Sequence, residues 1–470
     1  MSKRLWRVVA LVAVFALLAA ACSNDEGTDE TTTTTAATTT TQAATTTTQA
    51  ATSTTEAGMD VATDVGVTDE PCPGGNPDHG CIYLGVLTDE SGPFAAAAPA
   101  LFGAQQAFWA AVNAQGGLAG MYDVVVPDSL KKDTAYSADV MVQSYNEIAG
   151  DVLAIAQSLG TPQTLATLAD YDRDNTVAAP MSWYSGWNFN GVDKGLVVEF
   201  GTNYCFEGMN AVDWSMGALP AAGRPAPTTV GIAFFPTDYG LDYGAGVKEA
   251  AEANGLTVAW EIPIIPISAG GDPAQVEAVA AIVANPVDVT YLVTGPNETA
   301  AIVGGAASQG YQNLFIGAAP SWNVGILASP AAPAFQAGLY YQSSYVGGWD
   351  YESVGHATMR ATLDAAGVTP NDFFISGWVS QYGLKAALES AIASGDLTKA
   401  GLAAAAKTLT TVSYDGMMAE RSFAGAADDN APRASVIGQV DVTASTGISV
   451  LQDFFVGPTA AAYDFSEPCS

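Results

Sequence analysis

The chain has 470 residues, of which 49% are hydrophobic and 13% charged, and its formal net charge at pH 7 is −33. A surface this acidic repels nucleic acid and anionic lipid, so nucleic acid is not expected as a partner. The length exceeds what one compact core holds, which predicts two lobes.

An export signal is predicted at residues 1–21. Three basic residues precede an apolar run, Val8 to Ala21, that is too short to span a bilayer. The end of this run, Leu18-Ala-Ala-Ala-Cys22, resembles the bacterial lipobox, although the leucine lies four places before the cysteine rather than three. We therefore predict a lipid anchor at Cys22 on the outer face of the cell membrane, with cleavage without lipidation as the alternative.

A disordered tether is predicted from residue 22 to residue 71. The segment from Thr31 to Ala57 consists mainly of Thr and Ala and has no large apolar side chain. Such a segment cannot offset the entropy lost on ordering. It would serve as a plain spacer or, if O-glycosylated, as a stalk.

Four further cysteines follow, an even number in a chain that leaves the cytoplasm, which predicts two disulfides. Pairing Cys72 with Cys81 would close a short loop before the first strand and leave Cys205 to hold Cys469 near the C-terminus. No metal site is expected, because the spacing matches no zinc pattern and the chain has two histidines.

Alternating strands and helices are predicted along the body. Ile82 to Leu87 is an apolar run typical of a buried strand, and an apolar stripe from Leu101 to Val112 predicts the helix that follows. The alternation returns from Thr229, with Asp272 as the expected N-cap of one helix. Repeated strand–helix units imply α/β lobes with doubly wound parallel sheets.

Loops at the carboxyl ends of such strands bind ligands at one edge of the sheet. One of these loops carries Trp183, Tyr184 and Trp187 among small polar residues, which indicates a binding surface or, alternatively, packing of the loop on its lobe. The ligand-binding residues expected from these loops are Ser91, Phe94, Ser158, Gly160, Thr161, Ser182, Trp183, Tyr184, Tyr239 and Thr294.

Several motifs resemble the type I periplasmic binding proteins, in particular the branched-chain-amino-acid (Leu/Ile/Val) binding branch. These are Ile82-Tyr-Leu-Gly-Val-Leu, Ser91-Gly-Pro-Phe94, and the helix end Asn113-Ala-Gln-Gly-Gly-Leu-Ala-Gly120. The resemblance implies two lobes joined by a three-segment hinge, an extracytoplasmic solute-binding protein, an ABC permease as partner, no cofactor and no enzymatic activity. A monomer is expected.

The resemblance also implies where the chain changes lobes. Lobe 1 would comprise residues 72–190 and 344–412, and lobe 2 residues 191–343 and 413–470. Cys205 and Cys469 would then share a lobe, which supports pairing them.

Ligand contacts are implied by the same resemblance. The Thr161 hydroxyl, nearby amides and the loop around Ser182 would bind a carboxylate, and Tyr239 would approach from the second lobe. The family's amino-acid binders place a glutamate against the ligand ammonium where this chain has Ala319. We therefore expect a small polar or amino-acid-like ligand with an aromatic or amide portion, unless Asp238 or Glu298 supplies the missing charge.

Two other functions are compatible with the same lobes. One is a sensor that reports its ligand to a membrane receptor, and sequence does not separate it from a transport protein. The other is an exported α/β enzyme. The chain has neither Gly-x-Ser-x-Gly nor His-Glu-x-x-His, and His356, the one candidate base outside the Cys72–Cys81 loop, is expected to have a surface or capping role.

Overall fold

The computed structural model describes residues 61–470. The predicted signal, the lipidation site Cys22 and most of the predicted tether lie outside the described residues. None of the described helices is long and apolar enough to cross a membrane.

The folded body begins earlier than residue 72, the start expected from the sequence. Strand β1 (Ala62–Thr63) pairs with β13 (Asp396–Leu397), and β2 (Val67–Thr68) pairs with β3 (Gly80–Thr88). Gly66, between them, lies so close to the backbone of Leu153 that a Cβ there would be 2.0 Å from the Leu153 nitrogen. Short strands of this kind are fixed by their partners rather than by their own apolar pattern, which is why the sequence did not reveal them.

The first sheet is mostly parallel and has the order β2-β3-β6-β7, with two more strands paired to β3. Only β2 runs antiparallel to its neighbour. β3 is buried on both faces, as its continuous apolar run predicts. The remaining strands are β4 (Tyr122–Val125), β5 (Lys131–Asp133), β6 (Ala154–Leu159) and β7 (Ala178–Met181).

The second sheet has the order β17-β16-β12-β11-β10-β8-β9. Its strands from β12 to β9 are parallel, and β16 and β17 add an antiparallel edge. The strands are β8 (Thr229–Phe234), β9 (Thr257–Pro263), β10 (Val289–Val293), β11 (Leu314–Gly317), β12 (Tyr340–Ser344), β16 (Ser435–Val440) and β17 (Ile448–Phe455). A separate short pair is formed by β14 (Thr411–Val412) and β15 (Arg421–Ser422).

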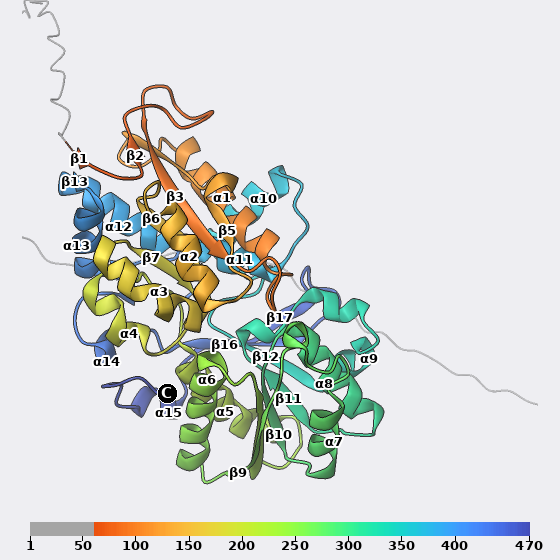
Figure 1. The fold of residues 1–470 in the computed structure, drawn as a ribbon. Helices are drawn as coiled ribbons and strands as arrows, with labels where there is room; N and C mark the ends of the chain where they lie inside the picture. Colours follow the sequence, from red (N-terminus) through yellow and green to blue (C-terminus); the bar gives the residue numbers. More distant parts are fainter. Residues whose placement is uncertain (1–60) are drawn as a thin grey trace, which may run out of the picture. The chain divides into compact units, whose positions relative to one another are not determined.

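Helices cover both sheets (Figure 1). Around the first sheet they are α1 (Ala98–Ala114), α2 (Ala138–Ile148), α3 (Thr161–Asp174), α10 (Val354–Ala365), α11 (Asp372–Val379), α12 (Gln381–Ala393) and α13 (Lys399–Thr408). The others are α4 (Trp187–Asn190), α5 (Tyr204–Ala221), α6 (Asp238–Ala253), α7 (Val276–Ala284), α8 (Pro296–Ser308), α9 (Ala332–Gln336), α14 (Ala427–Asn430) and α15 (Pro458–Ala462).

The chain returns to the first sheet after β12. Gln381 at the start of α12 donates from Nε2 to the Ala156 carbonyl of β6 at 3.0 Å, and its Oε1 accepts from Trp109 Nε1 of α1 at 2.9 Å. Figure 1 shows this return as the blue helices α10–α13 beside the orange and yellow elements of the first sheet. The structure therefore has the mixed α/β, parallel-sheet architecture that the sequence predicts, built from segments that alternate along the chain.

Candidate functional site

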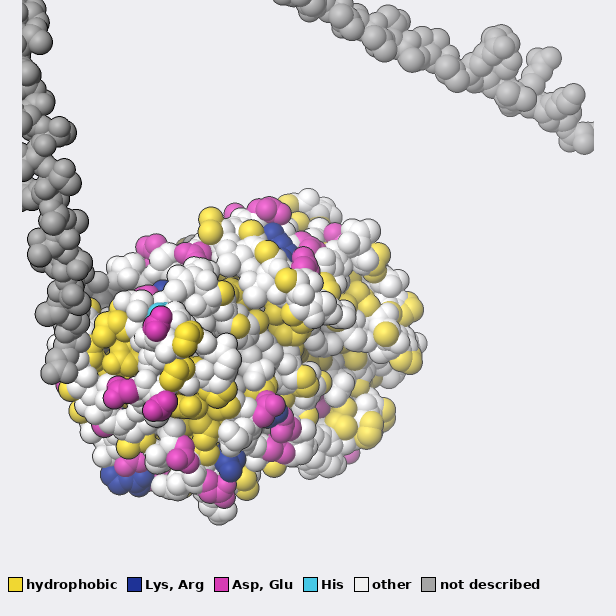
Figure 2. Space-filling model, turned by 90° about the horizontal axis from the view of Figure 1, so that it is seen from above, with side chains coloured by type: hydrophobic (Ala, Val, Ile, Leu, Met, Phe, Trp, Pro, Cys, Tyr) yellow, Lys and Arg dark blue, Asp and Glu magenta, His cyan; other side chains and the backbone are white. Residues whose placement is uncertain are grey.

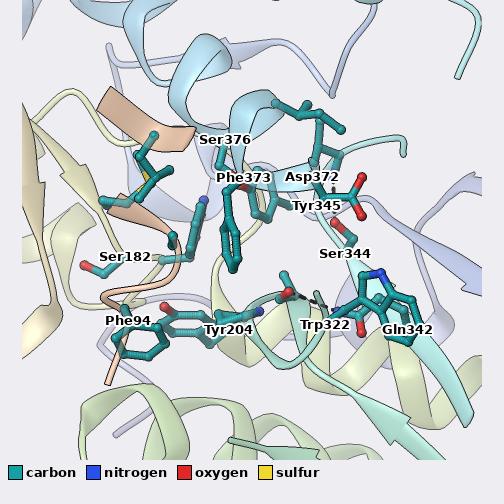
Figure 3. A pocket seen from close by; sticks show the side chains of 18 of the residues that line it. Phe94, Ser182, Tyr204, Trp322, Gln342, Ser344, Tyr345, Asp372, Phe373 and Ser376 are labelled. Atoms are coloured by element: carbon teal, nitrogen blue, oxygen red, sulfur yellow. Dashed lines mark hydrogen bonds between the residues drawn. The ribbon is translucent and has the colours of Figure 1, made fainter. Parts of the chain in front are cut away.

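A pocket lies where loops from the carboxyl ends of both sheets meet (Figure 3), and we call it the interlobe pocket. It collects residues that follow β3, β6, β7, β11 and β12, together with residues of α5, α11, β16 and β17. Its apolar and aromatic lining includes Phe94, Leu101, Leu159, Met181, Trp183, Trp322, Val346, Phe373, Ile375, Val436, Ile448 and Val450. Its polar lining is Tyr136, Thr161, Ser182, Tyr204, Tyr239, Gln342, Ser344, Tyr345, Asp372 and Ser376.

Six of the ten residues expected to bind ligand lie together in this lining: Phe94, Gly160, Thr161, Ser182, Trp183 and Tyr239. Tyr239 sits in the first turn of α6, where its hydroxyl donates to the Thr294 carbonyl at 3.3 Å. Elements around both sheets thus contribute to the lining of the pocket.

The other four expected residues do not line the interlobe pocket. Ser158 is buried in a hydroxyl cluster with Thr164 and Tyr171, and the Thr294 hydroxyl bonds to Thr299 at 2.8 Å. Tyr184 donates to the Ser470 carbonyl at 3.0 Å. Ser91 lies in the loop that Asp89 caps by accepting bonds from neighbouring backbone N–H groups. Each of these polar groups is used within the protein.

Thr161 is held at the first position of α3 by the sharp turn that precedes it. Gly160 has φ 97°, a left-handed conformation that favours glycine, and Pro162 follows at the start of the helix. Thr161 is 1% exposed, and its Oγ1 has no hydrogen-bond partner among the described residues. A helix N-terminus also leaves backbone N–H groups unpaired, so this end of the pocket offers donors to an acceptor.

Trp183 is the one member of the aromatic loop that reaches the interlobe pocket. Its ring packs on Tyr345 with centroids 4.4 Å apart, and its Nε1 is buried without a partner among the described residues. Trp187 is fully buried and donates to Ser182 Oγ at 3.3 Å, while Tyr184 packs against Trp187. The loop therefore lines the interlobe pocket with one aromatic ring and packs on its own lobe with the other two.

Asp372 is the only charged side chain in the lining of this pocket, and no lysine or arginine lines it. Burial raises the pKa of Asp372 to about 6, against hydrogen bonds from the Thr446 hydroxyl and the Trp349 N–H. Figure 3 places Asp372 across the pocket from Phe94 and Tyr204. The pocket is therefore predominantly uncharged.

A different glutamate, Glu207 of α5, binds the backbone at Ala319, the position where the family's amino-acid binders have their glutamate. The Ala319 N–H donates to Glu207 Oε1 at 2.8 Å, and Ser343 Oγ donates to the same oxygen at 2.7 Å. Burial raises the pKa of Glu207 to about 7, against these two bonds. Glu298 accepts from the Ile267 N–H at 2.7 Å, and neither it nor Asp238 lines the interlobe pocket.

Both histidines have structural partners. His79 Nδ1 lies 2.9 Å from Asp123 Oδ1, next to the Cys72–Cys81 loop. Of the surface or capping role expected for His356, the surface position is wrong, because the side chain is fully buried in α10. The residue does take part in the cap of this helix: its N–H donates to Oγ of the N-cap Ser353 at 3.1 Å and its Nδ1 lies 2.9 Å from that oxygen, while its Nε2 lies 3.2 Å from the Gly347 carbonyl. Burial lowers the pKa of His356 to about 4. The described residues contain no cluster of three side chains able to hold a metal.

The two predicted disulfides, Cys72–Cys81 and Cys205–Cys469, are present. The second joins the start of α5 to the end of the chain, where the Cys469 N–H donates to Ser185 Oγ at 2.9 Å.

Acidic side chains are scattered over the face seen in Figure 2 rather than gathered in one patch.

Sequence reasoning missed Tyr136, Tyr204, Gln342, Tyr345 and Asp372. Tyr136 follows β5, which is only three residues long and reads Lys-Lys-Asp, so no apolar run announced a strand there. Tyr204 begins α5, where Asn203 accepts a capping bond from the Phe206 N–H at 2.9 Å. That Asn-capped helix start was a usable signal.

A model of the periplasmic binding protein family matches residues 81–447. Among solved structures, a fatty acid ABC transporter substrate-binding protein from Thermomonospora curvata is 26% identical, with a TM-score of 0.75, and the match covers 87% of this chain and 97% of that one. A branched-chain amino acid ABC transporter protein from Thermus thermophilus with bound valine is 13% identical, with a TM-score of 0.65, covering 81% and 98%. Among curated proteins, none matches this chain.

Proposed function

We propose that this chain, which belongs to the periplasmic binding protein family, is the solute-binding component of an ABC-type importer and captures an organic ligand in the interlobe pocket. Proteins of this family act outside the cytoplasm as binding proteins rather than enzymes. The position of the pocket, where loops of both sheets meet, supports capture by closure of two lobes, since contacts made from both sides favour the closed form.

The ligand that fits this pocket best has an apolar body and one oxygen-bearing end. The observation that carries this conclusion is the lining, which is mainly apolar and aromatic and has Asp372 as its single charged group. A free amino acid would bring an ammonium into the pocket, where Asp372 already accepts a hydrogen bond from the Thr446 hydroxyl at 2.7 Å. An enclosed ammonium without a free charged partner is strongly unfavourable. The relative from Thermomonospora curvata, named as a fatty acid binder, supports the same class of ligand.

The polar end of the ligand would lie at the start of α3. Thr161 and the α3 amides supply donors there, and Ser182 and Trp183 flank them. Phe94 and Gly160 shape this side, and Tyr239 adds packing from α6. The remaining expected residues, Ser91, Ser158, Tyr184 and Thr294, would act by fixing the loops rather than by touching the ligand.

The attachment to the cell is proposed from the sequence alone. Residues 1–21 would be removed as a signal, the Cys22 thiol would carry lipid, and the Thr/Ala-rich tether would present the body, as a monomer, to a permease. Changing Cys22 to Ser should release the protein into the medium. Retention in the detergent phase of a partition assay would contradict lipidation.

The ligand class is tested by calorimetric titration of the purified protein with decanoate, leucine and lysine. Decanoate should bind, leucine weakly and lysine not at all, because the lining is mainly apolar and its one carboxylate, Asp372, already accepts hydrogen bonds from the Thr446 hydroxyl and the Trp349 N–H. Native mass spectrometry of the freshly purified protein identifies any cargo that it retains. Tight leucine binding without decanoate binding would contradict the proposed class while leaving the importer role intact.

A further inference from the structure

Tyr136 occupies an unusual backbone position beside the interlobe pocket. It lies between β5 and α2 with φ 53°, and Ala135 before it has φ 50°. Neither is a glycine, and two consecutive non-glycine residues in the left-handed region cost free energy that the surrounding structure must offset. Strained backbone positions of this kind cluster at active sites and ligand-binding sites.

Three contacts fix Tyr136 against the start of α3. Gln163 Nε2 of α3 donates to the Tyr136 carbonyl at 2.6 Å, and the ring of Phe94 packs on the tyrosine ring with centroids 5.2 Å apart. A Cβ at Gly160 would lie 2.8 Å from Tyr136 Cε2, so only glycine leaves room for this ring. The phenol is thereby held next to Thr161.

Tyr204 approaches the same end of the pocket from α5. Its ring packs on Tyr239 with centroids 4.7 Å apart and on Trp183 at 5.9 Å. Burial raises the pKa of Tyr204 well above its ordinary value, and the nearby Tyr136 phenol acts in the same direction. The two phenols come from elements that belong to different sheets, and both line the interlobe pocket.

Both phenols retain a free donor. Both residues line the pocket. Among residues 61–470, no side-chain or backbone group forms a hydrogen bond with the phenolic oxygen of Tyr136 or of Tyr204, so both O–H groups are open to the pocket that they line. With the unpartnered Thr161 Oγ1, this end of the pocket presents three hydroxyl donors.

We infer that Tyr136 and Tyr204 are ligand-recognition residues that close from opposite sides, with Thr161, on a carboxyl or other carbonyl oxygen of the ligand. The inference rests on the proposed function and specifies the head group of that ligand. Hydroxyl donors suit an oxygen acceptor, and although their oxygens can also accept from an ammonium, they bring no negative charge to balance it. The preferred class is an acyl compound without an amine next to its carbonyl.

The test removes one hydroxyl at a time. Tyr136→Phe and Tyr204→Phe keep the rings, and Tyr83→Phe, a partly buried tyrosine of β3 outside this pocket, is the matched control. Titrations use decanoate, decanamide and 2-aminodecanoate. Each pocket variant should bind decanoate and decanamide about tenfold more weakly or worse, with the melting temperature of the ligand-free protein unchanged, because only the hydrogen bond to the ligand is lost. The control should bind as the wild type does.

The outcomes separate this inference from the proposed function. Unchanged decanoate and decanamide affinity in Tyr136→Phe would overturn the role of the phenol although the ligand class stands. Equal affinity for decanoate and 2-aminodecanoate would overturn the head-group preference. If the wild type binds none of the probes, the proposed class fails, and native mass spectrometry then decides on the tyrosines by whether Tyr136→Phe loses the cargo that the wild type retains.

Discussion

The interlobe pocket and a second, buried cluster of polar residues differ in whether their polar groups bond to one another. We call the second group the hinge cluster, and it consists of Ser185, Asn188, Glu199, Asp242 and Arg421. In the hinge cluster, Arg421 Nη2 lies 3.0 Å from Glu199 Oε2, with exposed fractions of 1% and 0%, and donates to Asn188 Oδ1 at 2.7 Å. Asp242 accepts from the Ser185 N–H at 2.9 Å and from its Oγ at 2.5 Å.

The pocket instead holds neutral donors that have no partner, such as Thr161 Oγ1 and Trp183 Nε1. The hinge cluster pairs a buried cation with a buried carboxylate, although Arg421 Nε and Glu199 Oε1 have no partner among the described residues. The pocket has one carboxylate, Asp372, and otherwise offers neutral hydroxyl and indole donors. Substitutions in the hinge cluster should therefore change stability, whereas substitutions in the pocket should change affinity.

The largest effect is expected for Arg421→Met. It removes the cation from buried Glu199, whose pKa burial already raises to about 7, so the carboxyl can take up a proton and avoid part of the cost. The free energy of unfolding should therefore fall by about 3 kcal/mol, the lower end for a broken buried pair. Denaturant unfolding measures the loss. The control is Lys385→Met, which breaks the exposed Lys385–Glu389 pair and should cost less than about 1 kcal/mol. Equal small losses in both variants would contradict a structural role for the hinge cluster.

Glu207, which accepts from the N–H of the pocket residue Ala319, tests whether a buried carboxyl next to the pocket contributes to stability as the hinge cluster does. Its pKa is raised by burial from 4.5 to about 7, so the folded protein holds this proton more tightly than the unfolded chain does. Unfolding then releases a proton between these values, and the contribution of Glu207 to the free energy of unfolding should fall by about 2.6 kcal/mol as the pH rises from 4.5 to 7. Thermal melts across this range measure it.

Glu207→Gln should flatten that pH dependence, because the amide cannot ionise. A residual slope is expected from Asp242 and Glu199, whose pKa values burial raises to about 7, and from Asp372, whose pKa it raises to about 6. A variant that keeps the full slope of the wild type would show that Glu207 is not the group that titrates.

Thr161→Val should weaken decanoate binding about tenfold, because it removes a donor to the ligand. The same change should leave the melting temperature of the ligand-free protein unchanged or higher, since the hydroxyl is buried without a partner. Thr167→Val is the control: it lies on the same helix, and its hydroxyl bonds to the Gln163 carbonyl at 3.0 Å. Loss of stability without loss of affinity in Thr161→Val would contradict the assignment.

The smallest effect concerns the apolar end of the pocket. Gly348 lines it, and an added Cβ there would meet only the Ile448 carbonyl oxygen, at 3.6 Å. Gly348→Leu should therefore fold normally, fill the space near Ile448 and reduce decanoate affinity severalfold while sparing butyrate. Gly150→Leu, an exposed position outside the pocket, is the control. Equal affinity of Gly348→Leu for both acids would place the ligand's chain elsewhere.

The strands of both sheets were largely predictable, because buried parallel strands read as apolar runs such as Ile82 to Leu87. The first residues of the helices were less predictable from the sequence. The helix expected after Asp272 begins at Val276, because Gln275 adopts φ 47° and Asp272 instead caps the turn by accepting from the Ala274 and Val276 N–H groups. A local turn of this kind leaves no apolar pattern in the sequence.

The site could be predicted only where it follows a recognisable strand. Thr161 and Trp183 come directly after apolar strands and were found. Gln342, Tyr345 and Asp372 enter the pocket where the chain passes back toward the first sheet, and Tyr136 depends on a three-residue strand of charged residues. Long-range placement of this kind is set by tertiary packing, which sequence spacing does not encode.

The two disulfides differ in how much chain has to emerge before each can close. Cys72 and Cys81 are 9 residues apart, whereas Cys205 and Cys469 are 264 apart. When the chain leaves the cytoplasm with its N-terminus leading, the first pair can oxidise before Cys205 is outside, and the second has to wait for residue 469. Order of emergence thus separates the two oxidation events in time, which limits thiol–disulfide exchange between the pairs.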